Sequence, residues 1–295
     1  MNATRVRRNI GASIRQRLLD LTHAEGGDFQ LCLDRYAVER LLYRLSLSDA
    51  RDRFLLKGAL LFAVWFDVPH RPTRDADFLG LGTPDAAQLA DTVRGLCTLA
   101  ADDGIAYDVA SIRVQEIREQ ASYAGLRVTL RAALDNARCN LQLDVGFGDA
   151  VTPAPVEVDY PTLLNDLPRP RLRVYPRETA FAEKLEAIVL LGLANTRMKD
   201  YFDLLALARE GAMNPDTLGD AIAATFERRG TPLPEGLPQG LTTAFADDEG
   251  KRRQWTAFVN RNRLQAPRLD DVEKELTAFA AGPLTRARVL RKRQA

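Results

Sequence analysis

The chain has 295 residues, of which 46% are hydrophobic and 27% are charged, and its formal net charge is +1. These values are typical of a folded globular protein, and they exclude a disordered chain and a strongly basic nucleic-acid coat protein. Three scattered cysteines without C-x-x-C spacing, and no uncharged apolar run near the ~20 residues of a membrane span, lead us to expect a cytoplasmic protein with no membrane partner and no zinc site.

Residues 10–47 carry apolar side chains at helical spacing, and Gly26-Gly27-Asp28 interrupts them. This pattern predicts two helices joined by a short turn. We expect both to pack against a sheet and to carry no chemistry.

Residues 54–80 form the most informative stretch of the sequence. A short apolar run ends at Lys57, Gly58 makes a turn, and a helix-length apolar segment follows. Pro69 and Pro72 then break the chain before a second short run begins at Asp75. The predicted order is strand, glycine turn, helix, loop and strand.

Asp75 and Asp77 lie two residues apart on the second predicted strand. Successive side chains of a strand point to opposite faces, so the two carboxylates project from the same face. Two such carboxylates suit Mg²⁺ or Mn²⁺, because hard divalent cations prefer oxygen ligands. A polar strand face in water is the alternative, since D-x-D is common by chance.

Gly58 precedes the predicted helix, and Lys57 stands beside it. Glycine lets the backbone approach a phosphate closely, and a helix N-terminus offers unpaired N–H groups with a partial positive charge. A phosphate site and a metal site would then adjoin, as a nucleoside triphosphate with its metal ions requires.

Three further strands are predicted after a helix over residues 86–101, and the last of them carries Asp144. The alternation in Leu126-Val128-Leu130 is typical of a half-buried antiparallel sheet. Asp144 lies on the polar side of its strand, where it could join Asp75 and Asp77. The alternatives are an exposed carboxylate at a strand end and a role for Asp149 instead. The three predicted strands span residues 109–116, 123–132 and 138–147.

Prolines cluster between residues 153 and 176, and we place a domain junction there, with predicted domains of residues 1–165 and 166–295. The second domain is predicted to be helical. Its expected helices span residues 177–194, 199–210, 215–229, 241–262 and 269–281, followed by a basic tail.

Lys184 falls on a predicted helix whose apolar residues face the core. A lysine near a core face needs an anion, which could be a triphosphate or a salt bridge to a carboxylate such as Glu183 or Asp200. Asp200 and Asp203 are three residues apart and share one face of the next helix.

Several of these motifs together resemble the AbiEii-type nucleotidyltransferase toxins, which include the MenT toxins of bacterial toxin–antitoxin systems. The similarity covers roughly residues 50 to 210. Two departures stand out: Ala59 replaces the second glycine of the family's K-G-G motif, and no serine or threonine follows directly. The matching residues are Lys57 and Gly58, the R-x-T-x-D-x-D motif from Arg71 through Thr73 and Asp75 to Asp77, Asp144 on its strand, and the helical motifs with Glu178, Lys184, Arg197, Lys199, Asp200 and Asp203.

The resemblance implies an α+β fold in which a mixed nucleotidyltransferase-like sheet with flanking helices is joined to a mostly helical C-terminal domain. It implies transfer of a nucleoside monophosphate from an NTP to an acceptor hydroxyl, with the 3′ end of tRNA as the expected acceptor, a block of translation as the outcome, and a cognate antitoxin as partner. Modification of a protein target, or nucleotide or RNA binding without catalysis, are the alternatives. The roles implied are metal binding by Asp75, Asp77 and Asp144, general-base action by Asp144, nucleotide binding by Lys57, Gly58, Arg71, Thr73, Lys184 and Asp200, and a catalytic contribution from Lys184 and Asp203.

Overall fold

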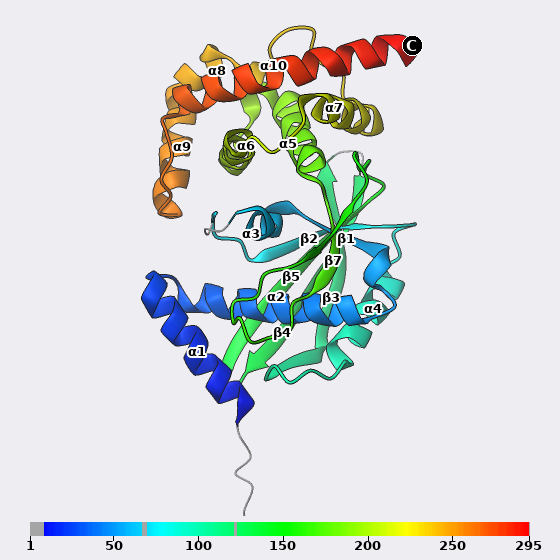
Figure 1. Cartoon of the computed structure of the whole chain (residues 1–295), viewed down its shortest axis with the longest axis vertical. Coiled ribbons are helices and arrows are strands. Elements are labelled where there is room, and N and C mark those ends of the chain that lie inside the picture. The colour runs from blue at the N-terminus through cyan, green and yellow to red at the C-terminus, as the bar shows by residue number, and fades with distance from the viewer. Residues whose placement is uncertain (1–8, 67–69, 121–122, 295) are drawn as a thin grey trace, which may run out of the picture. The chain divides into compact units, whose positions relative to one another are not determined.

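A computed structural model of the chain describes residues 9–66, 70–120 and 123–294. The chain divides into two compact units (Figure 1). The first comprises Met1–Gly148 and Glu157–Val174, and the second comprises Asp149–Val156 and Tyr175–Ala295. The prediction from sequence placed a single junction after residue 165, whereas the chain passes between the units three times.

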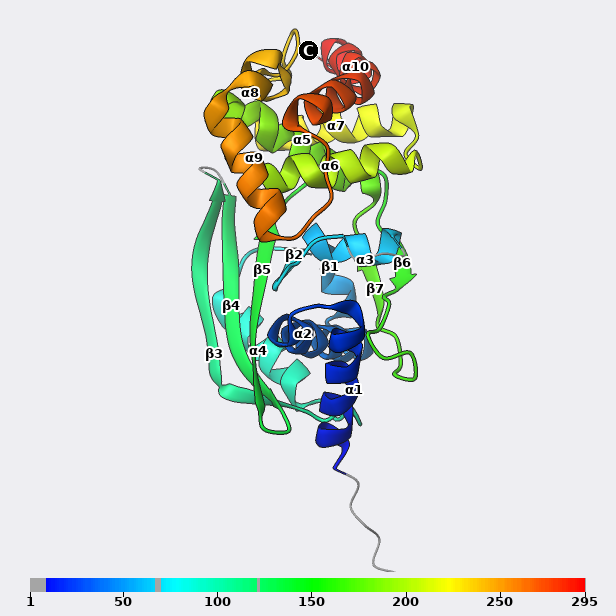
Figure 2. The same cartoon turned by 90° about the vertical axis from the view of Figure 1, so that its left-hand side faces the viewer.

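The first unit is built on a seven-stranded mixed sheet. The strands lie side by side in the order β3-β4-β5-β2-β1-β7-β6, and β3, β4 and β5 are the long ones (Figure 2). β2 pairs with β5 in parallel and with β1 in antiparallel orientation. The strands are β1 (Phe54–Lys57), β2 (Asp75–Gly80), β3 (Ile105–Gln120), β4 (Tyr123–Leu134), β5 (Ala137–Phe147), β6 (Val156–Asp159) and β7 (Arg171–Val174).

Helices α1 (Ile10–Glu25) and α2 (Phe29–Leu47) are separated by the predicted break, where the Asp28 side chain caps α2 by accepting a hydrogen bond from the backbone N–H of Leu31 (2.9 Å). α2 and α4 (Ala86–Thr98) cover one face of the sheet. Apolar side chains of both helices meet apolar side chains of the strands there, including Leu42, Val93, Phe78, Leu143 and Val145. The opposite face of the central strands is therefore left for polar side chains.

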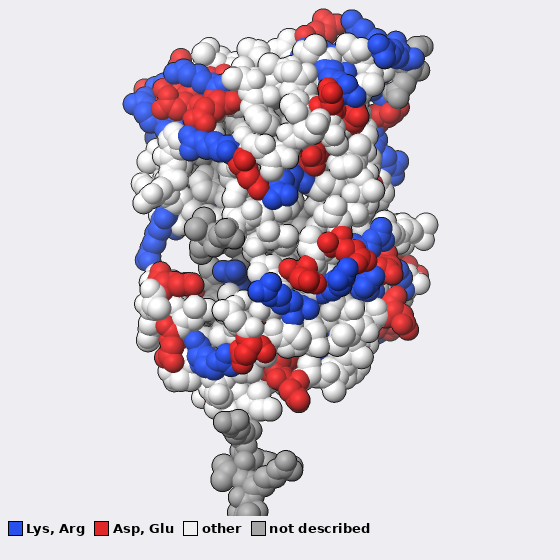
Figure 3. Space-filling view, viewed as in Figure 1, with Lys and Arg blue, Asp and Glu red and all other residues white. Residues whose placement is uncertain are grey.

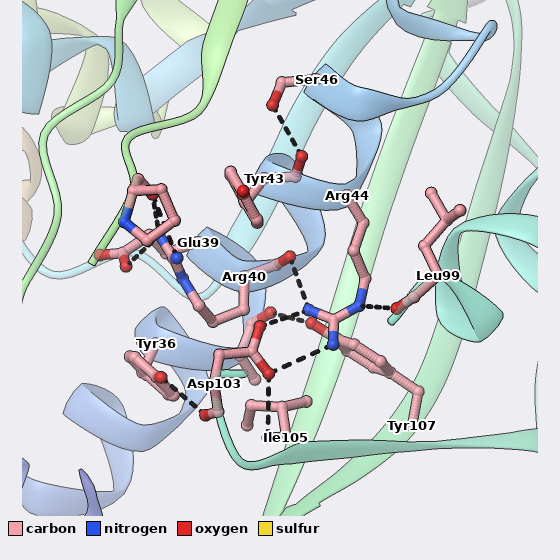
Figure 4. Close-up of polar contacts among 12 residues, drawn as sticks. Tyr36, Glu39, Arg40, Tyr43, Arg44, Ser46, Leu99, Asp103, Ile105 and Tyr107 are labelled. Carbon is pink, nitrogen blue, oxygen red and sulfur yellow. Dashed lines mark hydrogen bonds and ion pairs between the residues drawn. The ribbon is translucent and has the colours of Figure 1, made fainter. Parts of the chain in front are cut away.

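A buried polar network ties α2 to the loop that leads into β3 (Figure 4). The guanidinium of Arg44 forms two hydrogen bonds with the carboxylate of Asp103 (2.5 and 3.2 Å) and donates a third to the carbonyl of Leu99 (3.0 Å). The hydroxyl of Tyr36 donates to the carbonyl of Asp103 (2.8 Å). Because these groups are buried and paired, they fix the position of α2 against the sheet.

The second unit is helical, and its core lies where α10 packs on α7 and where α5 packs on α7 and α6. Phe181, Leu204, Ile222, Phe226 and Val272 are buried in it. The helices are α5 (Arg177–Leu191), α6 (Met198–Glu210), α7 (Pro215–Arg229), α8 (Thr243–Asp247), α9 (Glu249–Arg261) and α10 (Leu269–Gln294).

The proline-rich stretch contains strands β6 and β7, which are only four residues each and lie at one side of the sheet. Three predictions about individual elements are wrong. The apolar segment after Gly58 forms only a 3₁₀ turn (Gly58–Leu61) and a four-residue helix, α3 (Phe62–Trp65). The helix predicted over residues 241–262 is divided into α8 and α9. The predicted break at Pro69 lies outside the described residues.

The third error concerns α10, which continues through Pro283 to Gln294 instead of ending near residue 281. A proline inside a helix removes one backbone hydrogen bond. Leu284 and Ala287, which follow it, are nonetheless buried, and Arg286 forms ion pairs with Asp216 and Asp220 of α7. Packing on α7 therefore outweighs the local preference for a helix end.

Candidate active site

Four charged residues lie in one row across the polar face of the sheet. Lys57 of β1 pairs in register with Asp77 of β2, Asp77 with Asp144 of β5, and Asp144 with Arg127 of β4. Residues paired in register point to the same face, and neighbouring strands are about 4.8 Å apart. The row therefore brings Asp77 and Asp144 side by side although 67 positions separate them in sequence.

A second row runs parallel to the first. Asp75 pairs with Gln142, Gln142 with Thr129, and Thr129 with Arg113 of β3. Ala76, between the two aspartates, is buried toward the opposite face. Asp75, Asp77 and Asp144 are thus on one face of the sheet, as the strand alternation predicted.

Gly58 is fitted closely against Asp77. Its φ is +75°, in the left-handed region that favours glycine, and a Cβ built on it would lie 2.0 Å from Oδ2 of Asp77. Any larger residue would push the Asp77 carboxylate away. The sequence predicted a glycine that admits a phosphate; its immediate structural role is to leave room for this carboxylate.

Arg127 is the residue that sequence reasoning missed. Its guanidinium forms a bidentate ion pair with Asp144, with Nε–Oδ1 at 2.8 Å and Nη2–Oδ2 at 2.7 Å. The hydrogen bond to Asp144 raises the pKa of Arg127, and the carboxylates of Asp75 and Asp77 raise it further, so the guanidinium interacts with all three acids. Its place on the polar side of the alternating run Leu126-Val128-Leu130 was the available signal.

Arg71 and Thr73 precede β2, at the end of the connection from α3. The Thr73 hydroxyl donates to the backbone carbonyl of Asp75 at 3.4 Å, a weak local hydrogen bond. Both side chains are half-buried. Their predicted nucleotide-binding role stays a prediction.

Lys184, Asp200 and Asp203 come together in the second unit, on α5 and α6. Lys184 Nζ lies 3.2 Å from Oδ1 of Asp200 and 2.8 Å from Oδ2 of Asp203, and Arg197 Nε lies 2.7 Å from Oδ2 of Asp200. The salt bridge that the sequence allowed as an alternative is therefore present, and the predicted roles of these three residues in nucleotide binding and catalysis stay predictions. Asp149, the competitor of Asp144, lies outside β5 and pairs with Arg229 of the second unit (3.2 Å).

Asp75, Asp77 and Asp144 offer the type of ligand that a hard divalent cation prefers, because all three present carboxylate oxygens on one face of the sheet. Their arrangement fits only in part, since both oxygens of Asp144 are bonded to Arg127. Within the described part of the chain, no group of three or more His, Cys, Asp or Glu side chains is placed to hold a metal ion. Binding of Mg²⁺ or Mn²⁺ therefore stays a prediction.

Basic and acidic side chains interleave on the face drawn in Figure 3, and the formal net charge of the chain is +1. Among the residues that the structure describes, no helix is both long and apolar enough to cross a membrane.

The fold resembles solved structures of low sequence similarity. JHP933 from Helicobacter pylori matches with a TM-score of 0.53 and 17% identity over 90% of this chain and 97% of that one. A structure of a candidate nucleotidyltransferase from H. pylori matches with a TM-score of 0.52 and 17% identity, over 89% and 98% of the two chains. At such identities the likeness concerns the fold alone.

No curated protein matches the chain in sequence. A protein family does: the profile described as "Nucleotidyl transferase AbiEii toxin, Type IV TA system" matches residues 40–279. The match includes every residue of the two rows on the sheet and the Lys184 cluster. It confirms the family expected from the sequence motifs, and the chain belongs to the AbiEii nucleotidyltransferase toxins of type IV toxin–antitoxin systems.

Proposed function

We propose that the protein transfers a nucleoside monophosphate from an NTP to a hydroxyl of an RNA acceptor, with the 3′ end of tRNA as the expected acceptor. The observation that carries the proposal is the row of Lys57, Asp77, Asp144 and Arg127 on one sheet face, with Asp75 in the next row. Membership of the AbiEii family supports nucleotidyl transfer as the reaction type.

The reaction forms one bond and breaks one. The acceptor oxygen attacks the α-phosphorus of the NTP, the bond between the α- and β-phosphates breaks, and pyrophosphate leaves. The proton of the acceptor hydroxyl must be taken up, and Asp144 is our candidate base. Almost all of the rate enhancement in such a reaction comes from positioning and from charge stabilisation.

Each residue of the row has a definite task in this scheme. Lys57, buried beside Asp77, supplies positive charge to the phosphates. Gly58 keeps Asp77 in place. Arg127 holds both oxygens of Asp144 and so orients the base before the substrates arrive.

A divalent ion is the expected cofactor, and Asp75 and Asp77 would hold it, with Asp144 joining them once the guanidinium of Arg127 releases both of its oxygens. Mg²⁺ or Mn²⁺ would neutralise charge on the phosphates. Family membership also makes a cognate antitoxin the expected partner.

The test uses purified protein, Mg²⁺, total tRNA and each α-labelled NTP in turn. We expect label to enter RNA and pyrophosphate to be released, and Asp77→Asn to abolish both. Asp91→Asn, on the exposed surface of α4, is the matched control and should retain full activity. Activity that survives in both Asp77→Asn and Asp75→Ala would refute the site.

The same assay separates the alternatives. Label that enters protein from an α-labelled NTP indicates nucleotidylation of a protein target. Label that is transferred only from a γ-labelled NTP indicates phosphorylation. Triphosphate binding without release of pyrophosphate indicates a protein that senses nucleotides without catalysis.

A further inference from the structure

A polar groove with a volume of about 540 Å³ opens beside Asp75 on the first unit. Binding sites for small molecules and cofactors usually measure about 300–1,000 Å³, so the groove has room for a nucleotide-sized group. Arg74, Arg113 and Arg131 line it together with Thr129, Asn140 and Gln142.

The groove exists because β5 is longer than β2. The pairing of β2 with β5 begins at Asp75 and Gln142, so β2 leaves the earlier residues of β5 unpaired on that side. Side chains of α2 take over: Asp34 accepts from the backbone N–H of Asn140 (2.9 Å), and Gln30 donates to the carbonyl of Arg138 (2.9 Å). These backbone groups on the edge of β5 thus have hydrogen-bond partners although no strand covers them.

Basic side chains outnumber acidic ones in the lining of the groove, with three arginines against Asp34 and Asp75. Arg113 and Arg131 are exposed and both line the groove, Arg113 on β3 opposite Thr129, and Arg131 on β4 two residues beyond Thr129. Arg113 donates to the carbonyls of Ala110 and Ile112 (2.9 and 2.8 Å), and no described carboxylate forms an ion pair with it.

Arg131 pairs with Asp108 at 2.8 Å, but both side chains are exposed. An exposed ion pair contributes little, about 0–1 kcal/mol, so a phosphate can displace it. Arginine is suited to this exchange because its planar guanidinium binds phosphate oxygens in pairs.

The remaining side chains favour nucleic acid over a peptide. Thr129, Asn140 and Gln142 offer hydroxyl and amide groups that can bind ribose hydroxyls. The groove's apolar members, Leu130 and Leu141, are 3% and 2% exposed and leave no pocket for an apolar peptide side chain. No aromatic ring is among the described residues that line it, so bases are not held there by stacking.

We propose that this groove binds the sugar–phosphate chain of a nucleic-acid acceptor, with Arg113 and Arg131 on its phosphates, and leads its terminal hydroxyl toward Asp75. The inference rests on the proposed function for the identity of the reacting end. The groove adds what the row of carboxylates lacks, a surface that selects a polyanionic acceptor.

The experiment measures binding of fluorescein-labelled single-stranded RNA, without NTP, at salt concentrations between about 50 and 200 mM. We expect the double variant Arg113→Gln/Arg131→Gln to bind RNA at least tenfold more weakly. The slope of its log binding constant against log salt concentration should be shallower by about 1.4, because each phosphate contact on a single strand contributes about 0.7 to that slope. Binding of a fluorescent NTP with Mg²⁺ should be unchanged.

Arg171→Gln is the matched control. Arg171 lies in the same unit, is 63% exposed and pairs with Glu157 at 3.1 Å, whereas Arg131 is 66% exposed and pairs at 2.8 Å. We expect RNA binding and its salt dependence to be unchanged in this control. Thermal melts establish that all the variants are folded.

Three results would overturn the inference: an unchanged RNA affinity in the double variant, an equal loss in Arg171→Gln, or transfer of label to a protein while RNA is not bound. Failure of the proposed function has a different signature. If no nucleotide is transferred but RNA binding still depends on Arg113 and Arg131, the groove is an RNA site on a protein without this activity.

Discussion

The row of charged residues on the sheet and the charge clusters of the helical unit use the same residue types in different surroundings. In the row, the Arg127–Asp144 pair reaches solvent, since the arginine side chain is 37% exposed and the aspartate 10%. In the helical unit, Asp200 and Asp203 are fully buried against Lys184. The carboxylate of the row thus keeps some exposure, whereas the carboxylates of the second cluster, which we call closed, keep none and join α5 to α6.

Arg229 shows the closed arrangement most clearly. It lies 3.2 Å from Asp149, 3.3 Å from Glu183 and 2.9 Å from Glu186, and its side chain is only 9% exposed. The neighbouring carboxylates raise the pKa of Arg229 despite its burial. Buried charges of this kind are costly unless they are all paired. Mutation of Arg229 should therefore affect stability, and mutation of the open row should affect activity.

The largest expected effect on stability is that of Arg229→Met, which removes the cation that three carboxylates share, among them the fully buried Glu186. We expect it to lower the free energy of unfolding of the second unit by about 3–5 kcal/mol. Urea unfolding followed by Trp255 fluorescence measures this in a Trp65→Phe background, because the chain has two tryptophans.

Arg253→Met provides the control for this prediction. Arg253 pairs with Glu249 at 3.5 Å on the exposed surface of α9, and its loss should change stability by less than about 1 kcal/mol. The gap between the two variants should narrow at low pH, as the carboxylates become neutral. If the two variants lose the same free energy of unfolding at neutral pH, the distinction between closed and open charge clusters is wrong.

Gly58→Ala should damage both the stability and the activity of the first unit. The left-handed conformation costs about 1–2 kcal/mol for a residue with a Cβ, and overlap with Asp77 adds about 1–3 kcal/mol. Displacement of Asp77 should reduce nucleotide transfer at least tenfold. The measurements are urea unfolding and incorporation of labelled nucleotide.

Gly211→Ala isolates the contribution of the contact. Gly211 has a φ of +69°, close to the +75° of Gly58, but a Cβ there would meet nothing within 4 Å. Gly211→Ala should lose only the stability that the left-handed backbone conformation costs a residue with a Cβ, and it should keep full activity. If the two variants behave alike, the close fit of Gly58 against Asp77 has no functional consequence.

Glu39 extends the comparison to the buried side of the first unit, because it follows the closed pattern within the unit that carries the open row. Burial raises its pKa from 4.5 to about 6, and Arg40 and the backbone N–H of Leu163 offset only part of that effect. The folded state then binds a proton more tightly than the unfolded state. Stability should fall by about 2 kcal/mol as the pH rises from about 4.5 to about 6, and no further above that range.

Urea unfolding across this pH range checks the prediction on the wild type and on Glu39→Gln. The glutamine keeps an acceptor for the Leu163 N–H but does not titrate. We expect the free energy of unfolding of the variant to lose the part of the pH dependence that Glu39 contributes. Parallel curves for the two proteins would show that the pKa of Glu39 is the same in the folded and unfolded states.

Sequence alone predicted the parts of the fold that rest on local patterns. The alternation around Leu126-Val128-Leu130 indicated a strand in an antiparallel sheet, and the break at Gly26-Gly27-Asp28 separated α1 from α2. Strands β6 and β7 were missed because four residues between prolines show too little periodicity. The continuation of α10 past Pro283 depends on packing against α7, which no local pattern records.

The candidate site divides in the same way. The shared face of Asp75 and Asp77 follows from strand alternation, and the family motifs pointed to Asp144. The register that aligns Asp144 with Asp77 and with Arg127 arises from pairing between distant strands. The role of Arg127 could therefore not be predicted before the strands were placed. The same holds for the groove beside Asp75, because it depends on the different lengths of β2 and β5.

The smallest expected effect, that of Arg127→Gln, tests whether the open row can accept a metal ion. A cation shared by Asp75, Asp77 and Asp144 must first displace the guanidinium from both Asp144 oxygens. That pair is partly exposed, so breaking it costs about 1 kcal/mol, and the variant should bind Mn²⁺ about fivefold more tightly in the absence of nucleotide. Transfer to RNA should nevertheless fall, because Asp144 loses the group that orients it.

Arg94→Gln, on the exposed surface of α4, is the control and should change neither the Mn²⁺ affinity nor the transfer to RNA. Mn²⁺ titrations followed by electron paramagnetic resonance measure the affinity. A weaker affinity in Arg127→Gln would mean that Asp144 serves the arginine rather than a metal, and that the row holds its charges for the phosphates alone.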